Sequence, residues 1–194
     1  MRVFLAGATG VIGIRLVPLL IAAGHQVVGM TRSPGKSSSL RSLGAEAVVG
    51  SVFDTGWLER VVTEAAPDVL VNQLTDLPDS PEDLPGHHQA NARIRREGAD
   101  NLIAAGQSAG TRHWVSQSVA WPLPGESGAA ASHLEKATLA VGGTVVRYGR
   151  LYGPGTYFPD SKPVHPRVHV DDAAARTVPL LDAGPVVVEI VDPT

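Results

Sequence analysis

Three glycines spaced three apart, Gly7, Gly10 and Gly13, are the residues best suited to chemistry on a phosphate. They follow an apolar run at residues 3–6 and precede an apolar pattern of helical period that starts at Val11. A strand, a glycine turn and a helix present backbone N–H groups and the positive end of a helix dipole to an anion. Glycine also lets the main chain approach a pyrophosphate closely. We therefore predict a dinucleotide site here, rather than a purely structural turn.

A cation follows the next apolar run, residues 26–30. Sites that prefer NAD place an Asp or Glu there to bind the ribose 2′-hydroxyl. This chain instead has Arg32, Ser33 and Lys36, and no carboxylate before Glu46. Arg32 can make a forked, charge-assisted contact with a 2′-phosphate, to which Ser33 and Lys36 could add. We expect NADP(H) as the cofactor, with NAD(H) less favoured; the alternative is that Arg32 is a solvated loop cation.

The elements that must position these residues alternate along the chain. We predict strands near residues 3–6, 26–30, 45–49, 68–72, 111–116 and 186–191, and helices near 11–23, 36–43, 55–65, 87–108 and 173–181. The alternation predicts an α/β fold, a Rossmann-type doubly wound parallel sheet forming a single domain over 1–194. Ligands of such sheets lie outside the carboxyl ends of the strands.

Composition narrows the class of protein. The chain has 194 residues, 43% of them hydrophobic and 18% charged, with a net charge of −3 and no cysteine. Disulfides and thiolate metal sites are therefore excluded, and nothing favours nucleic acid as a partner. No apolar run approaches the ~20 residues that a bilayer span needs. We expect a cytoplasmic protein with a small-molecule substrate, no metal, no membrane partner, and a possible homodimer.

Five stretches, in order and at similar spacing, resemble the extended or atypical branch of the short-chain dehydrogenase/reductase superfamily, the NAD-dependent epimerase/dehydratase family. They are 7–13 (GATGVIG), 31–34 (TRSP), 91–110 leading into 114–118 (WVSQS), 146–155 (VRYGRLYGPG) and 168–173 (VHVDDA). The resemblance implies an oxidoreductase or epimerase acting on a small carbonyl or hydroxyl compound. It also implies a reduced C-terminal substrate lobe, with substrate-side elements within about residues 118–170.

The resemblance also implies roles for individual residues. Ser118 stands where the family keeps the active-site Ser or Thr that hydrogen-bonds the substrate carbonyl or hydroxyl. The implied cofactor-binding residues are Gly7, Thr9, Gly10, Val11 and Ile12 at the pyrophosphate, Arg32 and Ser33 at the 2′-phosphate, Val52 and Phe53 at the adenine, Leu74 and Thr75 at the nicotinamide side, and Tyr148 and Gly149 at the nicotinamide ribose and amide.

The chain departs from the family at the catalytic Tyr-x-x-x-Lys pair, in which the lysine lowers the tyrosine pKa. Residues 121–136 contain no tyrosine. If Lys136 is the family lysine, Ser132 replaces the tyrosine. If Glu135 is the acidic residue that follows the lysine by one helical turn, Ser127 and Ala131 replace the pair. We prefer the second register because it better preserves the distance to the next strand.

Four other side chains are candidates for the missing proton donor: Glu126, His133, Tyr152 and Tyr157. Surface or packing roles are the better interpretation of each. Two classes of function therefore remain open. The first is an NADP(H)-dependent oxidoreductase or epimerase. The second is a protein of the same fold with a different function. It would be either a non-redox isomerase, dehydratase or cyclase, or a binding module that senses NADPH.

Overall fold

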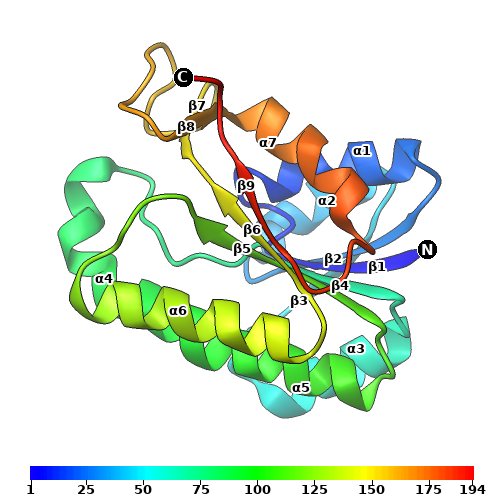
Figure 1. The fold of residues 1–194 in the computed structure, drawn as a ribbon. Helices are drawn as coiled ribbons and strands as arrows, with labels where there is room; N and C mark the ends of the chain where they lie inside the picture. Colours follow the sequence, from blue (N-terminus) through cyan, green and yellow to red (C-terminus); the bar gives the residue numbers. More distant parts are fainter.

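A seven-stranded, all-parallel sheet forms the centre of the computed structural model, which describes residues 1–194 (Figure 1). Across the sheet the strands are β3(Glu46–Val49), β2(Gln26–Thr31), β1(Arg2–Ala6), β4(Val69–Asn72), β5(His113–Val119), β6(Thr144–Tyr148) and β9(Val187–Ile190). Parallel neighbours need crossover connections, and the connecting helices cover both faces of the sheet. The Rossmann-type doubly wound α/β fold predicted from the sequence is confirmed.

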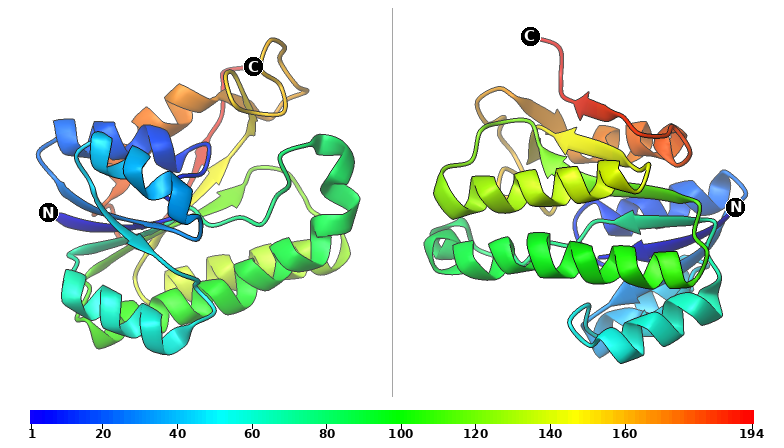
Figure 2. Two further views of the ribbon diagram at one scale, coloured as in Figure 1. Left: turned by 180° about the vertical axis from the view of Figure 1, so that it is seen from behind. Right: turned by 60° about the horizontal axis from the view of Figure 1, so that its bottom comes forward.

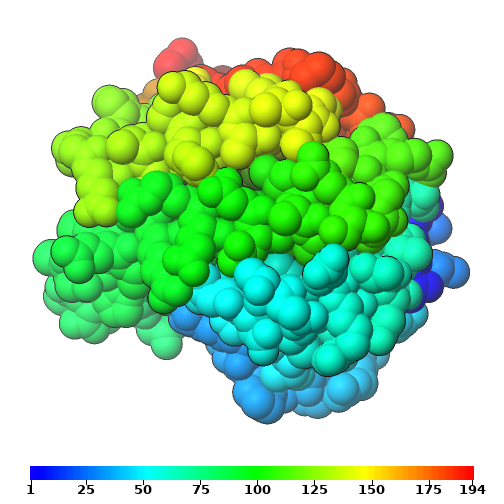
Figure 3. Space-filling view, turned by 90° about the horizontal axis from the view of Figure 1, so that it is seen from below, coloured from blue at the N-terminus to red at the C-terminus, as the bar shows by residue number.

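Helices lie on both faces of this sheet (Figure 2). One face carries α1(Gly13–Ala22), α2(Ser37–Ser42) and α7(Val170–Thr177), and the other carries α3(Thr55–Ala65), α5(Ala99–Ser108) and α6(Gly125–Ala140). Figure 3 shows α6, α5 and α3 as adjacent bands that cover the second face. No helix in the structure is both long enough and apolar enough to pass through a bilayer.

Two hydrophobic cores lie above and below the sheet because side chains alternate along each strand. In β1, Val3 and Leu5 join the core under α1 and α7, whereas Phe4 and Ala6 join the core under α3 and α5. All four are fully buried. The continuous apolar run that predicted a strand buried on both faces therefore has this physical basis.

Two predicted elements differ from the structure. The helix expected at 87–108 is divided into α4(Leu84–Arg93), a π-helical turn Ile94–Gly98, and α5. The strand expected at 111–116 runs on to Val119 as β5, because pairing with β6 extends as far as Val119 and Tyr148. Ser118 consequently lies inside a strand, and its side chain is buried with 5% exposure.

A small second sheet extends from the carboxyl end of β6. It pairs β7(Arg150–Tyr152) with β8(Arg167–His169), and the loop between them spans residues 153–166. Gly149 connects β6 to β7 and packs so tightly on β8 that a Cβ there would lie 2.6 Å from the Arg167 carbonyl carbon. This contact between backbones fixes the small sheet against the large one.

Replacing Gly149 with Ala should therefore destabilise the protein. The added methyl group meets backbone rather than a movable side chain, so we expect a loss of about 1–3 kcal/mol in the free energy of unfolding. Chemical denaturation measures it. The matched control is Gly56→Ala in α3, where no atom lies within 4 Å. Equal stability of the two variants would contradict the tight contact.

Candidate active site

The glycine turn between β1 and α1 is held by close backbone contacts. Gly7 has φ +82°, and a Cβ there would lie 2.6 Å from the carbonyl oxygen of Gln73, which follows β4. A Cβ on Gly13 would collide with the Gly7 carbonyl oxygen. Only glycine meets both demands, since it alone tolerates positive φ freely and has no side chain. The turn is thereby pressed against the carboxyl end of the sheet.

This turn leaves several donors free. The backbone N–H groups of Thr9, Val11, Ile12 and Gly13 donate to no backbone acceptor, and no side chain caps the start of α1. Their neighbour Gly10 donates to the Gly7 carbonyl at 3.0 Å. Unpaired N–H groups at a helix start, together with the helix dipole, form a site for an anion. The arrangement fits a pyrophosphate.

Arg32 follows β2 and is 65% exposed, but it is not a free cation. Its Nη2 donates to Oδ1 of Asp76 at 2.8 Å, and Asp76 lies in the loop after β4. The N–H of Ser33 donates to Thr31 Oγ1 at 3.1 Å, and Thr31 bonds Thr9 at 2.9 Å. The sequence shows no carboxylate near Arg32, so this partner was missed; only the sheet order brings Asp76 there.

The residues expected at the adenine follow β3, and those expected on the nicotinamide side follow β4, with β2 and β1 lying between these two strands in the sheet. Val52 is buried, and the Phe53 ring has the Arg93 guanidinium 4.0 Å from its centre. The Leu74 N–H donates to Asn72 Oδ1, and the Leu74 carbonyl accepts from Gln117 Nε2. Thr75 follows, partly exposed.

The Tyr148 side chain is enclosed between β4, β6 and α7. Its hydroxyl accepts from Gln73 Nε2 at 3.1 Å and donates to Thr177 Oγ1, which itself donates to the Ala173 carbonyl. Burial raises the pKa of Tyr148 to about 12, against the opposing effect of these hydrogen bonds. Tyr148, which was expected at the nicotinamide, thus has its hydroxyl bonded within the protein. Its side chain is not free to contact a ligand.

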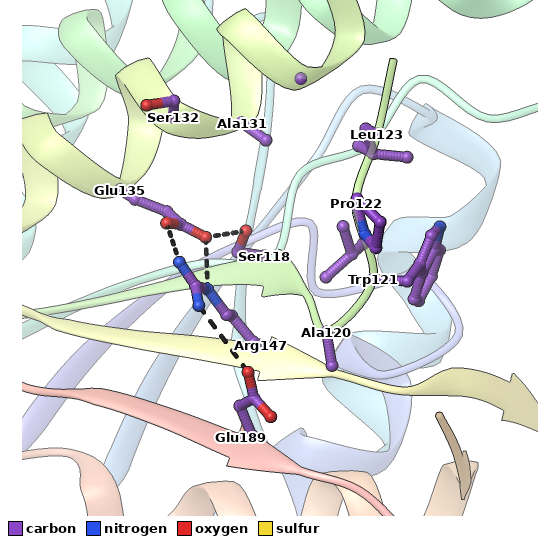
Figure 4. A pocket seen from close by; sticks show the side chains of 12 residues that line it. Ser118, Ala120, Trp121, Pro122, Leu123, Ala131, Ser132, Glu135, Arg147 and Glu189 are labelled. Atoms are coloured by element: carbon purple, nitrogen blue, oxygen red, sulfur yellow. Dashed lines mark hydrogen bonds and ion pairs between the residues drawn. The ribbon is translucent and has the colours of Figure 1, made fainter. Parts of the chain in front are cut away.

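Ser118, the expected active-site residue, belongs to a polar chain that joins α6 to the sheet (Figure 4). Its hydroxyl donates to Glu135 Oε1 at 2.6 Å. Arg147 on β6 donates to both oxygens of the same carboxylate, with Nε at 2.9 Å and Nη2 at 2.7 Å. Its Nη1 lies 3.7 Å from the Glu189 carboxylate on β9. Burial acts to raise the pKa of Glu135, but the hydrogen bonds from Arg147 and Ser118 outweigh it and leave that pKa below its ordinary value.

A cavity of about 490 Å³ opens beside the hydrogen-bonded side chains of Ser118, Glu135 and Arg147, between α6 and the loop after β5 (Figure 4). Its lining residues are Ser118, Val119, Ala120, Trp121, Pro122, Leu123, Gly128, Ala131, Ser132, Glu135, Arg147 and Glu189. No tyrosine, lysine or histidine is among them. Because the one proton of Ser118 is directed to Glu135, the lone pairs of its oxygen remain for a ligand.

The other candidate proton donors lie elsewhere. His133 of α6 pairs with Asp100 of α5 at 2.8 Å, and Glu126 pairs with Arg96 at 2.8 Å. The Tyr152 hydroxyl donates to Asp192, and that of Tyr157 donates to the Pro78 carbonyl. Surface and packing roles, the preferred interpretation, agree with these contacts.

Lys136 is exposed on α6 and lies outside the cavity, whereas Ala131 and Ser132 line it. Glu135, one turn after Ala131, faces Ser118. The cavity is thus lined by Ala131 of the preferred register and by Ser132 of the other register.

Arg95 is a candidate that sequence reasoning missed. It lies in the π-helical turn and is 8% exposed, although it forms no ion pair, unlike Arg93 and Arg96 on either side of it. Burial lowers its pKa, and the nearby Glu135 carboxylate opposes that effect. A buried guanidinium near the cavity adds positive potential there. The π-helical turn that contains Arg95 marks this position in the structure, but the spacing of apolar residues in the sequence does not reveal it.

Comparison with known proteins supports a nucleotide-binding chain. The model of an NAD(P)H-binding family matches residues 7–152. A 3-diazoavenalumate denitrifying reductase from a Streptomyces species is 36% identical over 180 residues, which cover 80% of this chain and 58% of that protein. The chain thus spans little more than half the length of this relative. An uncharacterized protein of Schizosaccharomyces pombe is 39% identical over 64 residues, 33% of this chain and 22% of that protein.

Solved structures share the fold. The UDP-glucose 4-epimerase of Thermotoga maritima, solved with UDP-glucose, has a TM-score of 0.81 at 19% identity, covering 98% of this chain and 77% of that one. The enzyme WbmH of Bordetella bronchiseptica, solved with NAD⁺, has a TM-score of 0.78 at 18% identity, covering 100% and 76%.

The polar chain around Glu135 predicts a pH-dependent contribution to stability. Because the pKa of Glu135 is lower in the folded protein than its ordinary value of 4.5, its contribution is complete above that pH and disappears as the pH falls through the folded value. Glu135→Gln should therefore be less stable than the wild type at neutral pH, with a difference that shrinks in acid. Thermal unfolding across pH measures it.

Ser132→Ala, on the same helix and without a charge, is the matched control and should differ from wild type equally at every pH. A constant deficit for Glu135→Gln would show that the charge of Glu135 contributes nothing to folding.

Proposed function

The chain belongs to the NAD(P)H-binding family and has the fold of short-chain dehydrogenase/reductase and epimerase enzymes, and from this we propose that it is an NADP(H)-dependent oxidoreductase acting on a small molecule. The observation that carries the proposal is the set of free N–H groups at the start of α1, at the same sheet edge as the Ser118 cavity. A bound nicotinamide dinucleotide would supply a hydride there.

Each part of the sheet edge has an assigned role in this proposal. The main chain of Gly7, Thr9, Gly10, Val11 and Ile12 would hold the pyrophosphate, Arg32 and Ser33 the 2′-phosphate, Val52 and Phe53 the adenine, and Leu74, Thr75 and Gly149 the nicotinamide side. Charge-assisted contacts from an Arg are the strongest of these. Residues 118–170 would supply the substrate side.

Ser118 would orient the substrate. Its proton points to Glu135, so its oxygen can accept a hydrogen bond from a substrate hydroxyl. Arg147 keeps Glu135 ionised and fixed in place. The pair therefore acts as a positioned acceptor, which favours binding of one substrate orientation.

The acceptor of the hydride can be of two kinds. A carbonyl takes a hydride on carbon, and its oxygen then needs a proton, which the cavity residues do not supply because no phenol, lysine or histidine lines the cavity. An arenediazonium ion takes a hydride, forms an aryl C–H bond and releases N₂, and it needs no proton. The reductase relative is named for a diazo compound. This second acceptor class is our second candidate beside small carbonyl compounds.

The cofactor preference is tested by replacing Arg32 with Ala. NADPH binding should weaken by roughly 1.5–3 kcal/mol, the scale of a hydrogen bond to a charged group, while NADH binding changes little. Isothermal titration calorimetry measures both. Gly10→Val is the control for the site itself and should abolish binding of both, since its side chain fills the phosphate cradle. Equal affinities of the wild type for NADPH and NADH would contradict the preference.

The catalytic assignment is tested by Ser118→Ala, with NADPH oxidation followed for a panel of small aldehydes, ketones and arenediazonium salts. For acceptors that carry a hydroxyl group, whose proton the Ser118 oxygen can accept, we expect kcat/KM to fall by about three- to tenfold, the scale of one hydrogen bond. Lys136→Met is the matched control and should retain activity, because Lys136 lies outside the cavity. Tight NADPH binding without turnover of any acceptor would instead favour a non-redox catalyst or an NADPH sensor.

A further inference from the structure

We propose that Asp76 is a cofactor-selecting residue, whose carboxylate competes with the 2′-phosphate of NADP(H) for Arg32 and offers an acceptor to the 2′-hydroxyl of NAD(H). The proposal rests on the proposed dinucleotide function. It concerns a residue outside every motif that the sequence offered, and it predicts a weaker preference for NADP(H) than Arg32 alone would give.

The Arg32–Asp76 ion pair joins the ends of two strands that are not neighbours in the sheet. Arg32 follows β2 and Asp76 follows β4, and these two strands lie on either side of β1. The 2.8 Å contact between them therefore crosses the carboxyl end of β1, where the glycine turn begins. The acidic partner that sites for NAD carry at the end of the second strand is supplied here from the fourth strand.

The two partners are not equally free to move, which decides how they compete. The Asp76 side chain is 21% exposed, and the Asp76 N–H donates to Asn91 Oδ1 at 3.1 Å. Two residues earlier, both backbone polar groups of Leu74 are bound. Arg32 is 65% exposed and bonds only to Asp76. The carboxylate is therefore the fixed partner and the guanidinium the mobile one.

Asp76 is the carboxylate that pairs with Arg32. Glu46, the next carboxylate after Arg32 in the sequence, pairs with Arg2 at the opposite end of the sheet. A 2′-phosphate must draw Arg32 away from Asp76 and then remain beside a fixed negative charge. A 2′-hydroxyl has no charge to repel and can donate to the carboxylate.

The test measures binding of NADPH and NADH to the wild type and to Asp76→Asn by isothermal titration calorimetry at constant ionic strength. We expect Asp76→Asn to bind NADPH about two- to fivefold more tightly, the range of an exposed ion pair that no longer has to be broken. NADH should bind less tightly by a similar factor. Asp79→Asn, in the same loop and without an ion pair, is the matched control and should change neither affinity.

Several outcomes would overturn the proposal. An unchanged ratio of the two affinities in Asp76→Asn would exclude selection by Asp76, as would the same change in Asp79→Asn. Asp76→Ser gives the same comparison if Asp76→Asn unfolds at the assay temperature. Failure of the wild type to bind either dinucleotide is a different result, because it contradicts the proposed function itself and this inference with it.

Discussion

Close contact between backbones at the glycine turn is the constraint on which the rest of this structure depends. Gly7 lies against the Gln73 carbonyl, and Gly13 lies against the carbonyl of Gly7. Any side chain at either position would push the turn away from the sheet edge. Because the turn is held there, the N–H groups of Thr9, Val11, Ile12 and Gly13, in the turn and at the first residue of α1, have no protein partner. A local steric rule in one turn thus creates the electrostatic feature that defines the proposed cofactor site.

A second constraint operates on the substrate side. Glu135 is 15% exposed, so its charge needs partners, and Arg147 and Ser118 supply three hydrogen bonds. These bonds hold α6 on β5 and β6, and they also commit the Ser118 proton. The same network that secures the helix therefore limits what Ser118 can do for a ligand, since its oxygen is left as an acceptor.

The two ends of the proposed cofactor site are governed by different kinds of force. The pyrophosphate end uses backbone groups whose positions are set by sterics, and it does not depend on the identity of most side chains. The proposed 2′-phosphate end would use one exposed cation, Arg32, and one carboxylate, Asp76, whose ion pair contributes little free energy and is sensitive to salt. Selectivity between the two dinucleotides can therefore change through single side chains without any change in the fold.

Periodicity and glycine spacing in the sequence were sufficient for the fold class, the sheet with helices on both faces, and the glycine turn, because these follow from local patterns of period 2 and 3.6. The resemblance to a known family, rather than any local pattern, singled out Ser118, whose hydroxyl donates to Glu135 in the structure. Only the tertiary structure decided the partners of these residues. Asp76 is 44 residues from Arg32, and Arg95 is buried near Glu135 through a π-helical turn. Tyr148 was expected beside the cofactor, yet its side chain is enclosed by α7. Ion pairs and burial depend on strand order and helix packing, and no local pattern encodes these long-range contacts.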